Sequence, residues 1–409
     1  MKKLVSLLLA VCMLMTLVSF AAAEEWKVAM ITDYGDITDQ SFNQTTYEAA
    51  KAFSEANGVD TPDTDGEMAV AMITDYGDIT DQSFNQTTYE AAKAWCEGNS
   101  VNFTYFKPAS DSDDDRISMI EKAIDEGYNV IVMPGYAFAP AIAATAGEYS
   151  DVIFIALDVS DFDLSSAGLD PLPANLYSAV YQEELCGYMA GYAAVKLGFT
   201  KLGFLGGMAV PAVIRYGYGF VQGADAAAKE LGLTDVSMKY AYGNQFFGDA
   251  DITAAMDTWY ADGTEVVFAC GGGIYTSAAE AAAKVGGKVI GVDVDQAGII
   301  DGTYGFGMTV TSAMKGLGAT VNTLLTQVKD GKFVGGKVEN LGLVSANPEE
   351  NYVQIPMGST QWNSDFHQET YKALVSDMLS GKITVSNDTE KSANDFATVI
   401  SLTDLGNIK

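Results

Sequence analysis

The feature that most constrains the fold of this chain is a regular alternation of short apolar strands with helical segments. A first set of strands is predicted at 70–73, 101–106, 129–133 and 152–157, with helices at 89–95, 115–126 and 139–148. A second set has helices at 183–197, 216–231, 252–262 and 277–284, with strands at 201–205, 236–242, 265–269 and 289–292. A helix between two strands returns the chain to the same end of the sheet, which makes the strands parallel. The pattern therefore predicts an α/β protein with two doubly wound parallel-sheet lobes.

The length of the chain also favours two lobes. It has 409 residues, 48% of them hydrophobic, which is more than one ordinary core holds. We expect an N-terminal lobe over 69–175, with part of the later crossover segments, and a C-terminal lobe with crossover segments over 176–409. The tail is predicted to form helices at 313–329 and 368–380 and a short strand near Ile383, and to return across the lobes at a hinge.

The N-terminal part of the chain contains a duplication, because residues 28–52 recur identically as residues 70–94. Two copies are too few for a repeat architecture, and only one copy can occupy the first strand position of a lobe. The second copy continues directly into the next predicted strand, whereas the first is followed by a linker rich in Asp, Thr and Gly. We therefore expect the second copy in the lobe and treat 24–68 as an extra segment with a linker. It stays open whether three residues of the first copy compete for the same place: Asp33, Phe42 and Asn43.

Residues 1–23 have the features of a secretory signal peptide. Two lysines precede an apolar run at 4–20, and three alanines at 21–23 offer the small side chains of a cleavage site. We therefore expect an exported protein that works outside the cytoplasm, in the periplasm or on the outer face of the cell membrane. Cys12 follows a valine where a lipid-attachment motif needs a small residue, which weighs against a lipid anchor without deciding the matter. Beyond the signal, Cys96, Cys186 and Cys270 are too few for a disulfide framework and are predicted to be buried free thiols.

The strongly acidic composition limits the partners of the chain. Its formal net charge is −31, and binding to phosphate backbones or anionic lipid head groups depends on clustered Lys and Arg. We therefore expect no nucleic-acid partner. A small neutral ligand remains compatible with this charge.

Little in the sequence indicates catalysis. His367 is the one histidine, no Gly-x-Ser-x-Gly motif occurs, and no set of Cys and His has zinc-ligand spacing. The acidic run 111–115 resembles the start of a calcium loop, but Arg116 stands where that loop needs glycine, so Asp113 or Asp114 is expected to cap a helix instead. No catalytic residue, metal or cofactor is expected, and His367 is interpreted as a surface or structural residue.

Polar and aromatic residues gather where the predicted strands end, which is where open α/β sheets bind ligands. Those of the first lobe are Asp75, Phe84 and Asn85, and those of the second are Phe247, Gly271, Asp293 and Lys315. A carboxylate beside a lysine suits vicinal hydroxyls, two aromatic rings suit a flat heterocycle, and an amide suits a base edge. Gly271 opens a triple glycine that permits close backbone approach, but a dinucleotide fingerprint would need glycine where Thr276 stands. Taken singly, each residue also fits a helix cap or a core position.

Several motifs together resemble one family. They are Ile73-Thr-Asp, Asp81-Gln-Ser-Phe-Asn-Gln86, Cys186-Gly-Tyr-Met-Ala-Gly191, Leu202-Gly-Phe-Leu-Gly-Gly-Met208, Gly291-Val-Asp-Val-Asp-Gln296 and Thr311-Ser-Ala-Met-Lys315. Their order and spacing are similar to the basic membrane protein family, the purine nucleoside receptor-like substrate-binding lipoproteins of ABC transporters. The resemblance implies a type I periplasmic-binding fold, three crossings between the lobes and a purine nucleoside in the cleft. It also implies roles: Asp75 and Asn85 bind the base, Phe84 and Phe247 stack on it, Asp293 and Lys315 hold the ribose hydroxyls, and Tyr216 is a weaker cleft candidate.

The function expected from these observations is solute capture for an ABC importer. A monomer would bind a nucleoside between its lobes, close, and pass the nucleoside to a transporter permease. Two alternatives stay open within small-molecule binding: a receptor for a sugar or another small solute, and a sensor that reports ligand occupancy. An exported nucleoside hydrolase is the alternative from a different class.

Overall fold

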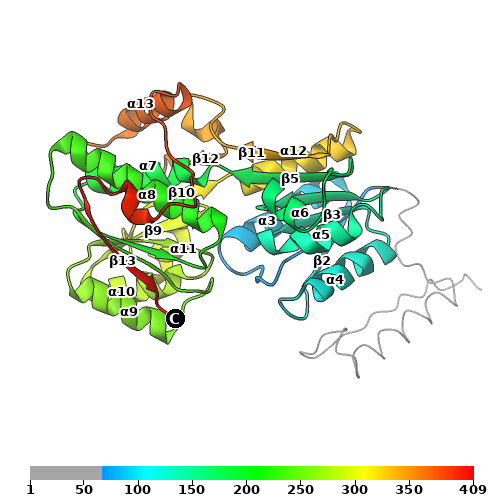
Figure 1. Ribbon diagram of the computed structural model, residues 1–409, viewed down its shortest axis with the longest axis horizontal. Coiled ribbons are helices and arrows are strands. Elements are labelled where there is room, and N and C mark those ends of the chain that lie inside the picture. Colours follow the sequence, from blue (N-terminus) through cyan, green and yellow to red (C-terminus); the bar gives the residue numbers. More distant parts are fainter. Residues whose placement is uncertain (1–66) are drawn as a thin grey trace, which may run out of the picture. The chain divides into compact units, whose positions relative to one another are not determined.

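The computed structural model describes residues 67–409, which contain two β-sheets (Figure 1). The first sheet has the strand order β11-β5-β4-β3-β1-β2, and every neighbouring pair in it is parallel. Its strands are β1 (Ala69–Ile73), β2 (Asn102–Phe106), β3 (Val130–Pro134), β4 (Ile153–Leu157), β5 (Leu176–Tyr181) and β11 (Lys337–Leu341). Its helices are α3 (Phe84–Asn99), α4 (Asp113–Asp125), α5 (Ala139–Thr145), α6 (Asp161–Ser166) and α12 (Leu317–Lys329). We call this part the first lobe.

The second sheet has the order β12-β10-β9-β8-β6-β7-β13 and is parallel except for β12, which runs antiparallel to β10. Its strands are β6 (Lys201–Gly206), β7 (Ser237–Tyr242), β8 (Val266–Cys270), β9 (Lys288–Asp293), β10 (Thr309–Lys315), β12 (Val353–Gln354) and β13 (Ser401–Asn407). Its helices are α7 (Glu183–Lys196), α8 (Pro211–Leu231), α9 (Ala250–Ala261), α10 (Tyr275–Val285), α11 (Ala297–Tyr304) and α13 (Gln368–Leu379). We call this part the second lobe.

Each sheet is buried between helices on both faces, as a parallel sheet requires. In the second lobe α7 and α8 cover one face and α9 and α10 the other (Figure 1). In the first lobe α3 and α12 pack on one face, and α4 and α5 on the other. The central strands are almost continuously apolar because neither face of them meets water: all five residues of β1, β3 and β8 are buried.

The chain passes between the lobes three times. It crosses from β5 to α7 at Gln182, from β10 to α12 at Gly316, and from β11 to β12 along residues 342–352. Two parallel-sheet lobes and three crossings confirm the predicted architecture. Two of these crossings are single residues, and all three leave the carboxyl ends of both sheets on either side of one cavity.

The second copy of the duplicated segment lies inside the first sheet. It provides β1, which pairs with both β2 and β3, and most of α3. The first copy and the predicted signal peptide lie outside the described residues. Among residues 67–409, no helix is both long enough and apolar enough to cross a membrane.

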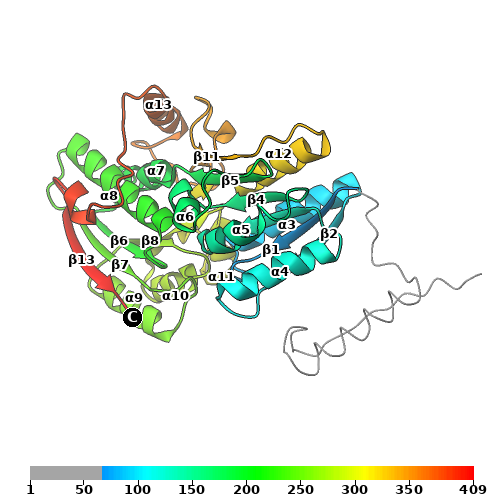
Figure 2. The ribbon, with the colours of Figure 1, turned by 45° about the vertical axis from the view of Figure 1, so that its right-hand side comes forward.

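Some predicted elements of the tail were wrong. The expected helix at 313–329 begins only at Leu317, because the chain continues β10 as far as Lys315 and then turns at Gly316. The strand expected near Ile383 does not form, since this residue packs on the core without reaching a sheet edge. The last strand is instead β13, which pairs with β7 at the outer edge of the second sheet (Figure 2).

Other local predictions had mixed outcomes. Ser112, and not Asp113 or Asp114, caps α4, because the serine side chain accepts a hydrogen bond from the N–H of Asp115. The three aspartates that follow the cap lie in the first turn, where their charge favours the helix dipole. His367 is exposed and caps α13. The prediction of free thiols is confirmed for the three cysteines in the described part of the chain: Cys96, Cys186 and Cys270.

Candidate functional site

A cavity of about 600 Å³ lies between the two lobes, at the carboxyl ends of their strands. All eight residues predicted from the sequence line it: Asp75, Phe84, Asn85, Tyr216, Phe247, Gly271, Asp293 and Lys315. The structure therefore brings together side chains that are up to about 240 positions apart in the chain. Their contact with a ligand remains a prediction.

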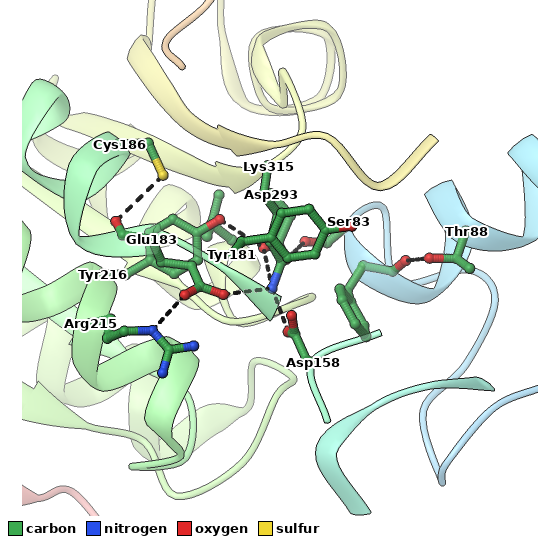
Figure 3. Close-up of polar contacts among 12 residues, drawn as sticks. Ser83, Thr88, Asp158, Tyr181, Glu183, Cys186, Arg215, Tyr216, Asp293 and Lys315 are labelled. Atoms are coloured by element: carbon green, nitrogen blue, oxygen red, sulfur yellow. Dashed lines mark hydrogen bonds and ion pairs between the residues drawn. The ribbon is translucent and has the colours of Figure 1, made fainter. Parts of the chain in front are cut away.

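Lys315 is the centre of a buried charged cluster at one end of this cavity (Figure 3). Its ammonium lies 2.5 Å from Asp158 Oδ2, 3.5 Å from Glu183 Oε1 and 3.8 Å from Asp293 Oδ1. The ammonium also lies 4.6 Å from the centre of the Phe84 ring. Three neighbouring carboxylates raise the pKa of Lys315 despite its burial, so the side chain stays charged.

Glu183 links this cluster to a second cation. Its side chain is fully buried at the start of α7, directly after the first crossing, and its Oε2 accepts a hydrogen bond of 2.7 Å from Arg215 Nε. Each oxygen of Glu183 thus has a cationic partner, which is the condition under which a buried carboxylate is tolerated. The network fixes the position of Lys315 before any ligand arrives.

Asp293 ends β9 with a left-handed backbone, φ being +64°. Its Oδ1 accepts a hydrogen bond of 3.2 Å from the Tyr216 hydroxyl, and its Oδ2 accepts one of 2.7 Å from the Ser83 hydroxyl. Such a backbone is unfavourable for a residue with a side chain and is often found at functional sites. Tyr216, the weaker candidate, is therefore a buried support for Asp293. Ser83 belongs to the first lobe, so its bond joins the two lobes.

Asp158 was missed by the sequence reasoning. It follows β4 directly, has φ of +63°, and points its carboxylate at Lys315 from the first lobe (Figure 3). Its Oδ1 is buried with no hydrogen-bond partner in the described chain. Burial raises the pKa of Asp158 to about 6, even though Lys315 opposes this rise. The sequence pattern could have identified Asp158 as a site residue, because it follows a predicted strand just as Asp75 and Asp293 do.

Asp75 follows β1 and lines the cavity from the first lobe. Its Oδ1 accepts hydrogen bonds from the backbone N–H groups of Tyr76 and Gly77, at 2.7 and 3.1 Å. Its Oδ2 lies against the backbone of Gly135, where an added Cβ would come within 2.2 Å of that oxygen. Burial raises the pKa of Asp75 to about 6.

Asn85 lies in the first turn of α3 and also lines the cavity. Its Nδ2 donates to Asp81 Oδ2 at 3.1 Å, while its Oδ1 is buried without a partner among the described residues. Asp81 also accepts from the backbone N–H groups of Ser83, Asn85 and Gln86. Asp81 thereby satisfies the start of the helix, which leaves the Ser83 side chain free to reach Asp293.

The aromatic residues of the wall come from both lobes. Phe84 is half-buried beneath Lys315, whereas Phe247 is 61% exposed on the loop between β7 and α9. Phe246, which sequence reasoning missed, lies against Gly271: an added Cβ there would lie 3.0 Å from the phenylalanine ring. The predicted close approach at Gly271 is thus made by a packed ring. A flat ligand in this cavity would meet aromatic surface contributed by each lobe.

The chemistry of the site suits binding. Its wall offers a lysine paired with carboxylates for hydroxyl groups, and oxygen acceptors without a partner in the described chain for N–H groups. Among the described residues no group of His, Cys, Asp and Glu has a geometry that would hold a metal ion.

Comparison with known proteins identifies the class. Residues 68–383 match the Bmp family, described as ABC transporter substrate-binding protein PnrA-like, and the chain belongs to this family. It is 28% identical over 378 residues to the ABC transporter nucleoside-binding protein BmpA of Lactococcus lactis subsp. cremoris, an alignment that covers 88% of each chain. Substrate-binding proteins of ABC transporters work outside the cytoplasm and deliver solutes to a membrane permease.

Solved structures agree on the fold. A solute-binding protein of an ABC transporter system from Aeropyrum pernix K1 matches with a TM-score of 0.59 and 20% identity, covering 81% of this chain and 90% of that one. One from Conexibacter woesei matches with a TM-score of 0.59 and 21% identity, covering 78% of this chain and 99% of that one. The chain thus has the type I periplasmic-binding fold predicted from its motifs.

Proposed function

We propose that this protein binds a nucleoside, with a purine base, in the cavity between its lobes. One observation carries the proposal: the same cavity is lined by a lysine–carboxylate cluster, by aromatic side chains, and by two acceptors that receive no hydrogen bond from the described residues, Asp75 Oδ2 and Asn85 Oδ1. A ribose with its two hydroxyls suits the cluster, and a base edge with N–H groups suits the two acceptors. The name of the L. lactis relative, a nucleoside-binding protein, supports the same ligand class.

Capture works by closure of the lobes on the ligand. Ser83 to Asp293 and Asp158 to Lys315 are contacts between side chains of different lobes, and Asp293, Asp158 and Lys315 line the cavity. A ligand that touches both lobes stabilises the state in which these contacts form, and this state is the one that a permease would recognise. The protein acts as a monomer, without a cofactor, and leaves the nucleoside unchanged.

The test is isothermal titration calorimetry of the exported form with nucleosides, free bases and pentoses. Binding of purine nucleosides, with much weaker binding of ribose and of free bases, is expected because only a nucleoside reaches both ends of the cavity. Binding of pentoses alone would overturn the proposal in favour of a sugar receptor. Release of free base during long incubation would instead show a hydrolase.

A further inference from the structure

The described chain continues beyond the part that the family model matches. That match ends at residue 383, and residues 384–409 follow it. They include β13, which adds a strand to the outer edge of the second sheet beside β7 (Figure 2). We call residues 384–409 the β13 segment. Since it lies outside the family match, its own contacts must explain what it does.

The β13 segment is anchored on α8. Asp225, a buried residue of that helix, accepts hydrogen bonds from three successive backbone N–H groups at 398–400, of 2.7, 2.7 and 3.2 Å. The strand that follows is different, because six of its seven residues are exposed. Ordering an exposed strand costs conformational entropy and gains little from apolar burial. Core packing therefore does not explain why β13 is present.

β13 leads the chain to the loop between β7 and α9. The backbone N–H of Ile408 donates to Tyr242 O at 2.8 Å, where β7 ends. The ammonium of Lys409 then donates to Gln245 Oε1 at 3.1 Å and to the carboxylate of Asp249. The β13 segment is thus fixed to α8 before the strand and to this loop after it.

The loop that Lys409 contacts is part of the cavity wall. Residues 244–248 all line the cavity. The side-chain amide of Gln245 donates to Phe247 O at 2.8 Å and to Asp249 Oδ2 at 3.0 Å, so it bridges the loop from within. The ammonium from the β13 segment binds both residues that this bridge joins, which fixes the bridge from outside.

We propose that the β13 segment positions this loop for ligand binding, with Lys409 as the positioning residue. Phe247 is 61% exposed, so the backbone of the loop, and not packing of the ring, sets where the ring lies. Lys409 does not line the cavity and acts through Gln245, whose amide holds the carbonyl of Phe247. A loop that is already fixed loses less entropy when a ligand binds, which gives tighter binding and slower release. The effect on release of a nucleoside rests on the proposed function.

The experiment compares Lys409→Met with the wild-type protein and with Lys409→Arg, which keeps the charge and the donors. Stopped-flow measurement of inosine release should show dissociation about fivefold faster in Lys409→Met, because a bond from a charged donor is lost, and near the wild-type rate in Lys409→Arg. Lys239→Met is the matched control. Lys239 lies on β7, beside β13, and pairs with Asp262 at 3.0 Å, but it does not line the cavity or contact the loop, so its loss should leave the release rate unchanged.

Hydrogen exchange of the free protein gives a second readout that needs no ligand. The backbone N–H groups of Gly243, Asn244 and Asp249 are hydrogen-bonded, and Lys409→Met should speed exchange over residues 243–249 several-fold, whereas Lys239→Met should not. Unchanged exchange or an unchanged release rate in Lys409→Met would overturn the inference, as would equal effects in Lys239→Met. If the wild-type protein does not bind inosine while exchange over the loop responds as expected, the proposed nucleoside function fails and the positioning of the loop stands.

Discussion

The two ends of the cavity solve the problem of buried charge in opposite ways. At the Lys315 end, three carboxylates, one ammonium and one guanidinium pair with one another within the protein. Around Asp75 and Asn85, which also line the cavity, a carboxylate oxygen and an amide oxygen have no ion pair or hydrogen bond to any described residue. Most oxygens of the Lys315 cluster have a partner without a ligand, Asp158 Oδ1 being the exception, whereas Asp75 Oδ2 and Asn85 Oδ1 receive no hydrogen bond from the described residues.

Because of this difference, one group of residues positions the ligand and the other discriminates between ligands. A network whose members fix one another holds its groups in place, so hydroxyls that bind there lose little energy to rearrangement. Unpaired acceptors add little rigidity but reject any ligand that lacks the right donors, because the acceptors then remain buried and unsatisfied. The Lys315 end should therefore control stability and overall affinity, and the Asp75 end should control the choice of base.

Removing the ammonium group of Lys315 should have the largest effect on stability and affinity, because three buried carboxylates then lose the cation that they share. Lys315→Met leaves the carboxylates of Asp158, Glu183 and Asp293 buried with Arg215 as the remaining cation. Loss of one partner from a buried pair costs about 3–5 kcal/mol of unfolding free energy. Urea unfolding at about pH 8 measures this loss, and calorimetry should show that nucleoside binding is lost as well.

Lys284→Met provides the matched control for this change. Lys284 also pairs with a carboxylate, Asp257, at 2.9 Å, but both side chains are more than 40% exposed. An exposed pair contributes only about 0–1 kcal/mol. If Lys315→Met cost no more than Lys284→Met, the cluster would not be the stabilising end of the cavity.

Changing the pH should have the next largest effect, because it titrates buried carboxyls at both ends and at the start of α7. Burial raises the pKa values of Asp75 and Asp158 to about 6, and burial together with the charge of Glu183 raises that of Glu184 to about 7. In the unfolded chain these groups titrate near pH 4. The folded protein therefore holds more protons between these values, so their contribution to stability is complete below about pH 4 and is lost as the pH rises through 6 to 7.

We expect the unfolding free energy to fall by about 2 kcal/mol or more between pH 5 and 7.5, a decrease that denaturant titrations can measure. Asp75→Asn should make the decrease smaller, since it removes one titrating group from the folded state. A flat or rising stability over this range would show that the carboxyls are already ionised at pH 5, and would weaken the contrast between the two ends.

Sequence reasoning found two of the carboxylates that follow strands and missed the third, Asp158, and most of the charged groups that support them. Asp75 and Asp293 follow strands that are plainly apolar, and parallel strands collect their carboxyl ends at one edge, so these residues could be placed. Glu183 and Arg215 could not, because each lies in a helical pattern and their pairing depends on how α7 packs against α8. Burial of charge is a tertiary property that local pattern does not reveal.

The fold shows the same division. The strands of the alternating βαβ pattern were predicted within one or two residues, since most of them are apolar on both faces. β5, β10 and β11 were missed or mistaken because they adjoin the crossings, where strand follows strand or helix without the usual loop. Their place in a sheet depends on pairing with strands far away in the sequence, as β11 pairs with β5.

The smallest expected effect concerns the bond that joins the lobes. Ser83→Ala removes the hydroxyl that donates to Asp293 Oδ2 at 2.7 Å, while Tyr216 and Lys315 remain near Asp293. The loss should be about 1 kcal/mol, or roughly fivefold in nucleoside affinity, because this bond forms only when the lobes are together. Ser178→Ala is the matched control: its hydroxyl is also buried and donates to Val159 O at 2.6 Å, but within the first lobe. Ser178→Ala should lower the unfolding free energy and leave affinity unchanged, so equal affinity losses in both variants would show that the bond from Ser83 plays no part in closure.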